Sequence, residues 1–138
     1  MKATAIVVCL FCAMTAKAQT YYDEYGSAKG TKTIDSYGTT IYRDEHGSQR
    51  GLARTDASGQ TTFKDEHGIT TGSSQTDASG NTIYQDEHGI QSGSSQTDAY
   101  GTTLYRDEHG FVRGSSRINS SGHTIYRNEH GVQVGSMR

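Results

Sequence analysis

The stretch TIYQDEHGIQSG, residues 82–93, joins a short β-branched and aromatic run to Asp-Glu-His-Gly and then to a second glycine. The tetrapeptide Asp-Glu-x-Gly begins at Asp23, Asp44, Asp65, Asp86 and Asp107, and Asn128 begins a sixth copy. Every interval between these copies is 21 residues. A fixed short period is typical of repeat architectures, in which each unit is one supersecondary element. The chain is therefore just under six copies of one unit.

A second turn sequence, Asp/Asn-x-x-Gly, alternates with the first. It begins at Asp35, Asp56, Asp77, Asp98 and Asn119. An Asp or Asn side chain accepts a hydrogen bond from the backbone two residues on, and the glycine that follows adopts positive φ easily. Both tetrapeptides therefore predict a type I turn with a bulge. Two turns in each repeat leave two extended segments in each repeat.

The first extended segment is rich in β-branched and aromatic residues, which favour strands. It reads TTIYR (39–43), QTTFK (60–64), NTIYQ (81–85), TTLYR (102–106) and HTIYR (123–127). The second segment carries a glycine in every copy, which predicts a bend or bulge there. These glycines are Gly51, Gly72, Gly93, Gly114 and Gly135. The predicted unit is a small hairpin, about residues 60–72 in one copy, followed by a polar connector, SSQTDASG.

Each repeat offers few apolar side chains, such as Ile83, Tyr84 and Ile90. Burying three of them supplies roughly 5–9 kcal/mol, whereas ordering a repeat costs on the order of 30 kcal/mol. A single hairpin is therefore unstable, and neighbouring hairpins must stack. The sequence predicts an all-β fold, an elongated, solenoid-like array of β-hairpins over residues 19–138. An aromatic row would follow the array, made of Tyr42, Phe63, Tyr84, Tyr105 and Tyr126.

Residues 1–18, MKATAIVVCLFCAMTAKA, differ from the repeats. An early lysine, an apolar run too short to span a bilayer, and closing small residues are typical of a signal peptide. Cleavage is expected between Ala18 and Gln19. Cys9 and Cys12 lie inside the apolar run, so the processed chain would have no disulfide. The sequence thus predicts an exported protein, secreted or periplasmic, that does not span a membrane.

The charge of the repeats limits the kinds of partner. Residues 19–138 keep 11 of the 13 Lys and Arg and all 15 Asp and Glu, so their formal charge is 11 − 15 = −4. Nucleic acid is an unsuitable partner for this chain, because phosphate binding needs a basic face. No cofactor-binding loop and no candidate nucleophile are recognisable. The sequence therefore predicts no cofactor and no enzymatic activity.

The pattern Y-x-D-x-x-G-x-x-x-G resembles the hairpin repeats of bacterial cell-wall-binding modules of the choline- and glucan-binding type. TIYQDEHGIQSG (82–93) and TLYRDEHGFVRG (103–114) carry it best. A weaker resemblance is to the YD repeats of large secreted shells, and the whole chain is similar to uncharacterised exported proteins built of such units. The resemblance implies stacked hairpins and a glycan or cell-wall ligand. The modules build their ligand cages largely from tryptophan, however, and this chain has none.

The Asp-Glu-His run has two interpretations. Asp and His could ligate a metal or transfer protons, which would make His46, His67, His88, His109 and His130 weak metal candidates. Alternatively, Asp and Gly build the turn, while Glu and His occupy its exposed central positions. Tyr25 replaces His in the first copy and Asn128 replaces Asp in the last. These substitutions favour the turn, and a row of equal open turns offers no single preorganised pocket for catalysis.

Two rows of side chains share one register along the repeats. The aromatic row could be the core, or it could be a platform against which sugar rings stack. The threonine row, Thr40, Thr61, Thr82, Thr103 and Thr124, matches an ice-binding surface or an ordinary solvated strand face. The sequence thus predicts a structural or binding role outside the cytoplasm, with a carbohydrate- or cell-wall-binding module as the alternative.

Overall fold

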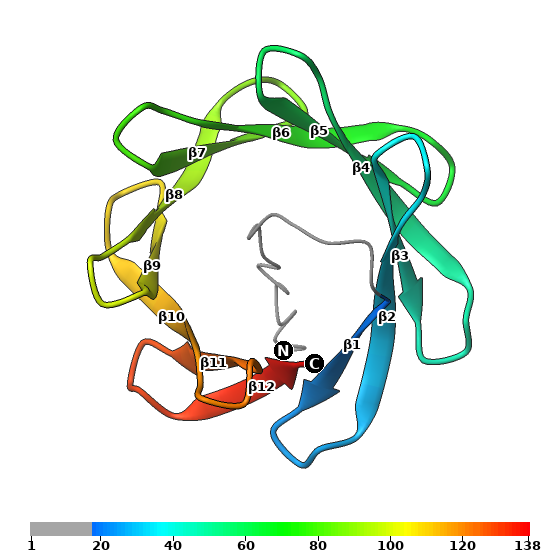
Figure 1. Ribbon diagram of the computed structural model, residues 1–138. Coiled ribbons are helices and arrows are strands. Elements are labelled where there is room, and N and C mark those ends of the chain that lie inside the picture. Colours follow the sequence, from blue (N-terminus) through cyan, green and yellow to red (C-terminus); the bar gives the residue numbers. More distant parts are fainter. Residues whose placement is uncertain (1–17) are drawn as a thin grey trace, which may run out of the picture.

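A computed structural model describes residues 18–138, which form twelve antiparallel β-strands closed into a barrel (Figure 1). The predicted signal peptide, apart from Ala18, lies outside the described residues. The strands are β1 (Gln19–Asp23), β2 (Ala28–Ile34), β3 (Thr39–Asp44), β4 (Gln49–Thr55), β5 (Gln60–Asp65), β6 (Thr70–Thr76), β7 (Asn81–Asp86), β8 (Gln91–Thr97), β9 (Thr102–Asp107), β10 (Val112–Ile118), β11 (Thr124–Asn128) and β12 (Gln133–Met137). Each repeat contributes one hairpin.

The prediction of an elongated array is wrong, although the all-β part of it is confirmed. Consecutive strands pair all along the chain, and β1 also pairs with β12, which closes the sheet. At this seam Tyr22 lies opposite Ser136. The backbones of Thr20 and Arg138 exchange two hydrogen bonds of 2.9 and 3.1 Å. Strand twist gives every hairpin the same rotation relative to its neighbour, and bulges increase that rotation, so the sixth hairpin meets the first.

The turns have the geometry that the tetrapeptides predict. At the turn of residues 86–89, the N–H of Gly89 donates to the carbonyl oxygen of Asp86 over 3.1 Å. Gly89 has a φ of 79°, in the left-handed region that glycine favours. Oδ1 of Asp86 accepts hydrogen bonds from the N–H groups of His88 and Ile90, each 2.9 Å long. The turn interpretation of Asp-Glu-His-Gly is therefore confirmed.

A β-bulge follows each Asp/Asn-Glu-x-Gly turn. In every repeat the ladder skips one residue on the second strand, immediately before the strand glycine. At Gly93 an added Cβ would lie 2.6 Å from the carbonyl oxygen of Arg106 in β9, so the backbones approach too closely for any side chain. This confirms the predicted bulge at the glycines. The skipped residues, here called the bulge residues, are Lys29, Arg50, Thr71, Ser92, Arg113 and Val134.

The predicted polar connector is wrong in part. Its first four residues, Ser73–Thr76, belong to β6 and pair with β5 and β7. Only the Asp-Ala-Ser-Gly tetrapeptide makes a turn. Serine and glutamine are poor strand formers, but the two flanking strands supply a complete set of backbone partners, and this context overrides propensity.

The aromatic row lies on the inner face of the barrel. Tyr84 faces Gly93 across the ladder, and the same face carries Ser95 and, opposite Tyr42, Lys32 of the first repeat. Lys32 is only 6% exposed and Ser95 only 7%. Side chains converge on the concave side of a closed sheet and spread apart on its convex side, so a strand lysine this buried must point inward. Tyr21 continues the aromatic row into the first repeat.

The barrel holds few deeply buried apolar groups. In the described part of the chain, the buried hydrophobic residues are Ala53 and Met137. Threonine hydroxyls pair across strands on the inner face, with Oγ1–Oγ1 distances of 2.8 Å for Thr76 and Thr82 and 2.7 Å for Thr97 and Thr103. Thr61, Thr82 and Thr103 of the threonine row thus pair with threonines of the preceding strand, whereas Thr40 and Thr124 lie opposite Ile34 and Ile118. Over residues 18–138 there is no helix long and apolar enough to cross a membrane.

Candidate functional site

The six Asp/Asn-Glu-x-Gly turns lie at one end of the barrel. They join β1 to β2, β3 to β4 and so on, whereas the Asp/Asn-x-x-Gly turns join β2 to β3 and its equivalents. Alternate turns of an antiparallel barrel lie at opposite ends. One rim, here called the acidic rim, therefore presents Glu24, Glu45, Glu66, Glu87, Glu108 and Glu129 from equivalent turns.

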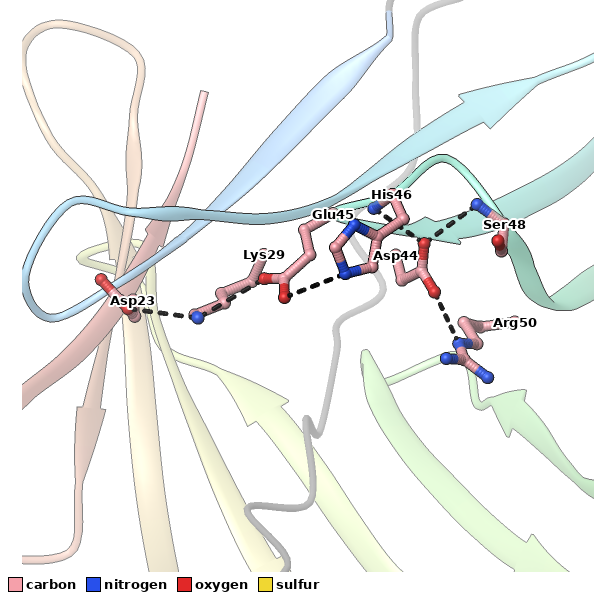
Figure 2. A network of polar contacts seen from close by, with 7 residues as sticks. All are labelled: Asp23, Lys29, Asp44, Glu45, His46, Ser48 and Arg50. Atoms are coloured by element: carbon pink, nitrogen blue, oxygen red, sulfur yellow. Dashed lines mark hydrogen bonds and ion pairs between the residues drawn. The ribbon is translucent and has the colours of Figure 1, made fainter.

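Each rim aspartate binds the backbone of its own turn through Oδ1, and Oδ2 takes no part in these turn hydrogen bonds. Figure 2 shows this at Asp44, where Oδ1 accepts from the N–H groups of His46 and Ser48, each at 2.9 Å. Oδ2 points the other way, toward the guanidinium of Arg50 at 3.0 Å. Desolvation raises the pKa of Asp44, but these hydrogen bonds and the Arg50 charge outweigh it, and the net pKa is lowered.

Bulge residues join neighbouring turns in three places. Nζ of Lys29 lies 3.7 Å from Oδ2 of Asp23 in its own turn and 3.5 Å from Oε2 of Glu45 in the next turn (Figure 2). Arg50 repeats this arrangement with Asp44, and its Nη1 lies 3.8 Å from Oε1 of Glu66. A β-bulge re-aims a side chain, and here it directs the cation into the gap between two turns.

Arg113 makes the third of these bridges. Its Nη2 lies 2.7 Å from Oδ2 of Asp107, and its Nη1 lies 3.3 Å from Oε2 of Glu129. The offsets are constant, since the bulge residue follows its aspartate by six residues and precedes its glutamate by sixteen. At the equivalent positions in β6 and β8 the bulge residues are Thr71 and Ser92, which carry no charge.

The rim histidines are exposed and dispersed. Their side chains are 71–80% exposed, and each Nε2 lies 3.6–3.9 Å from the glutamate of its own turn. Among residues 18–138, no three His, Cys, Asp or Glu side chains come together in a way that could hold a metal ion. The structure thus places the five metal candidates on one rim but gives them no shared ligand set.

The aromatic candidates face inward, and two of them bond to the next strand. The hydroxyl groups of Tyr84 and Ser95 lie 2.9 Å apart, as do those of Tyr105 and Ser116. Burial raises the pKa of Tyr84, against the effect of the hydrogen bond to Ser95. The five residues are half-buried. They line the inner face together and do not form an outward platform.

A hollow of about 500 Å³ lies on the opposite face over β9, β10 and β11. Arg117, Ile125 and Arg127 line it together with Ser115. It contains no carboxylate and no histidine among its lining residues. The sequence interpretation did not single out these residues.

Comparisons with known proteins give only distant likenesses, to solved structures. No family model matches. No curated protein matches either. Among solved structures, the chain is similar to the crystal structure of BamB from Moraxella catarrhalis, with 11% sequence identity and a TM-score of 0.36. That match covers 81% of this chain, and the chain spans only 56% of the length of BamB. A likeness this distant transfers neither an activity nor a ligand.

Sequence reasoning missed the bridging cations. Lys29, Arg50 and Arg113 directly precede the strand glycine. They form no obvious motif, because the other copies carry Thr, Ser or Val at this position. The signal was their constant offset from one aspartate and one glutamate. That signal becomes meaningful only when strand register places the glutamate of the next turn beside the bulge.

Proposed function

We propose that this chain is an exported, non-enzymatic binding protein that acts at the cell envelope or outside the cell. The observation that carries the proposal is the acidic rim, where six equivalent turns point their variable side chains in one direction. The aspartates are held by backbone N–H groups, and the histidines lie open to solvent. Such groups suit repeated recognition better than chemistry, which needs a shared, preorganised pocket.

Multivalency follows from six equivalent turns on one closed ring. Several weak contacts to one partner raise the overall affinity without any strong single site, provided that the geometry allows simultaneous engagement. A closed barrel fixes the distances between its turns, which supports such engagement. The export part of the proposal rests on the signal-like residues 1–18 alone.

The test is capture from material outside the cytoplasm. The full chain, immobilised through a tag, is exposed separately to a glycan array, to isolated cell wall and to the envelope and culture proteins of its host. Specific retention of at least one of these, competed by free protein, supports the proposal. If none is retained, the binding role is wrong and a purely structural role stands.

Carbohydrate binding through the aromatic row is a second candidate. It is supported by the composition of the inner face, where aromatic rings alternate with serine and threonine hydroxyls, as sugar-binding surfaces require. Changing Tyr84 and Tyr105 to Ser would remove two rings, and changing both to Phe, as in Phe63, would keep them. Glycan retention that is lost in the Ser variant but kept in the Phe variant, with both folded, supports this candidate.

A further inference from the structure

We infer that the arc of the acidic rim from residue 65 to residue 111 docks a basic segment of a partner protein, which inserts two Lys or Arg side chains into two gaps between turns. This inference rests on the proposed binding function and specifies its partner. The argument begins with the three gaps that the chain fills itself.

The filled gaps show what the carboxylates accept. In each, Oδ2 of one turn's aspartate and the glutamate of the next turn contact a single Lys or Arg, at 2.7–3.8 Å. The same strand register and the same turn geometry recur in the other repeats. The barrel thus contains three examples of a carboxylate pair holding a basic side chain.

Two adjacent gaps keep the carboxylates but have no bridging side chain. Thr71 stands between Asp65 and Glu87, and Ser92 stands between Asp86 and Glu108. In the described chain neither pair contacts a lysine or an arginine, in contrast to the filled gaps. The exposed fractions agree, since the side chains of Glu87 and Glu108 are 56% and 53% exposed, against 40–44% for the bridged glutamates.

The same arc also exposes apolar side chains. Ile69, Ile90 and Phe111 directly follow the glycines of its three turns and are 63–65% exposed. In the first two repeats the equivalent residues are Ser27 and Ser48, and in the last repeat the equivalent residue is Val132, which is 59% exposed. Exposed apolar groups beside unbridged carboxylates match a segment that alternates basic and apolar residues, because both kinds of contact are then satisfied together.

The spacing of the gaps defines the segment further. Adjacent gaps are two strands apart, which at about 4.8 Å per strand and a tilt of about 40° is roughly 12–13 Å along the rim. An extended chain rises about 3.3 Å per residue and alternates its side chains between two faces, so two basic residues that enter both gaps would be about four positions apart. A basic side chain is the ligand of choice here over a divalent metal, since no three potential metal ligands come together in residues 18–138.

The experiment fills the two gaps from within. In Thr71→Arg/Ser92→Arg, the new side chains occupy the position that Arg50 and Arg113 have in their own gaps. The matched control, Thr71→Gln/Ser92→Gln, adds side-chain length without charge. The probe is a fluorescein-labelled, nine-residue extended peptide with arginine at its third and seventh positions and leucine between them. A second peptide carries citrulline, which is neutral, in place of both arginines.

Fluorescence anisotropy with the full chain gives the outcome. The arginine peptide should bind wild type and the Gln variant alike, and the Arg variant about tenfold more weakly, because two exposed ion pairs are lost. Arg50→Thr, which opens one more gap, should tighten binding. Thermal unfolding checks that each variant is folded, and the citrulline peptide gives the same comparison without any variant.

Several results would overturn the inference. These are equal binding of the Arg variant and wild type, equal binding of the citrulline peptide, or no binding of the arginine peptide at millimolar concentration. Displacement of the peptide by micromolar calcium would show a divalent ion to be the occupant instead. These failures are distinct from failure of the proposed function, which would show as no capture of any glycan, wall or protein fraction.

Discussion

A disulfide across the seam between β1 and β12 would lock the barrel, because Tyr22 and Ser136 are register partners in neighbouring strands. The variant is Tyr22→Cys/Ser136→Cys, with Cys9 and Cys12 changed to Ser so that no other thiol competes. Thr20 and Arg138 exchange both backbone hydrogen bonds, so Tyr22 and Ser136, two residues further along the ladder, form a hydrogen-bonded pair as well. The Cα atoms of such a pair are about 5.5 Å apart, which is the distance that a disulfide prefers.

The magnitude follows from the length of the closed loop. Residues 22 to 136 enclose 115 residues, and restricting a loop of this length in the unfolded chain is worth about 5 kcal/mol. Engineered disulfides often give less, so the oxidised form should be about 2–5 kcal/mol more stable than the reduced form. Changing Tyr22 also removes the ring that Arg138 covers at 4.8 Å, but oxidised and reduced samples share this loss.

The assay combines mass spectrometry with urea unfolding. Non-reducing gels and mass spectrometry should show an intramolecular disulfide in the monomer. Circular dichroism should then give a higher urea midpoint for the oxidised sample than for the sample with dithiothreitol. In an open array these two residues would lie at opposite ends and could cross-link only between molecules. A product made only of disulfide-linked dimers, or no gain in the midpoint, would refute the closed barrel.

Three further predictions concern single residues. Asp86→Ala should lower the free energy of unfolding by about 1–2 kcal/mol through loss of the turn hydrogen bonds, whereas Asp86→Asn should be nearly neutral and Glu87→Ala should change it by less than about 0.5 kcal/mol. Equal losses of stability in the two Asp86 variants would contradict the turn assignment. Gly93→Ala should lower it by about 1–3 kcal/mol, because the added Cβ meets a carbonyl oxygen at 2.6 Å; an unchanged urea midpoint would show that the close approach is absent. Hydrogen bonds lower the pKa of Asp56, chiefly the one from the Ser58 hydroxyl, and the pKa of Asp77, chiefly the one from the N–H of Asn81. The stability that they contribute should be complete above about pH 4 and should fall as acid protonates both carboxylates. A free energy of unfolding that stays constant down to about pH 2 in urea titrations would exclude this contribution.

The turns and strands were predictable because their determinants are local. Asp86 and Gly89 fix a turn through bonds that reach no further than four residues, and the run 81–85 has strand propensity of its own. The glycine bulge was predictable for the same reason. Each of these features recurs with the repeat, so every copy in the sequence predicts the same turn and the same strand.

Closure was not predictable, because it depends on how small rotations add up. The local pattern of residues 82–93 is the same in an open array as in a ring, and no single repeat records the rotation between hairpins. The inward direction of Tyr84 depends on closure in turn, since a strand alternates its faces but does not say which one is concave. The bridges on the acidic rim could be located only after strand register was known, because Arg50 and Glu66 come together through that register.

Closure also fixes how many repeats the molecule can have. An open solenoid gains or loses a unit at its ends while the remaining units stay as they were, since each unit touches only its neighbours. Here a seventh hairpin would enlarge the circumference of the barrel and alter the tilt of every strand. A chain with five repeats would leave β1 and its last strand without a partner at the seam. Duplication or loss of a 21-residue unit would therefore change the whole ring, so the copy number is itself a structural parameter of this protein.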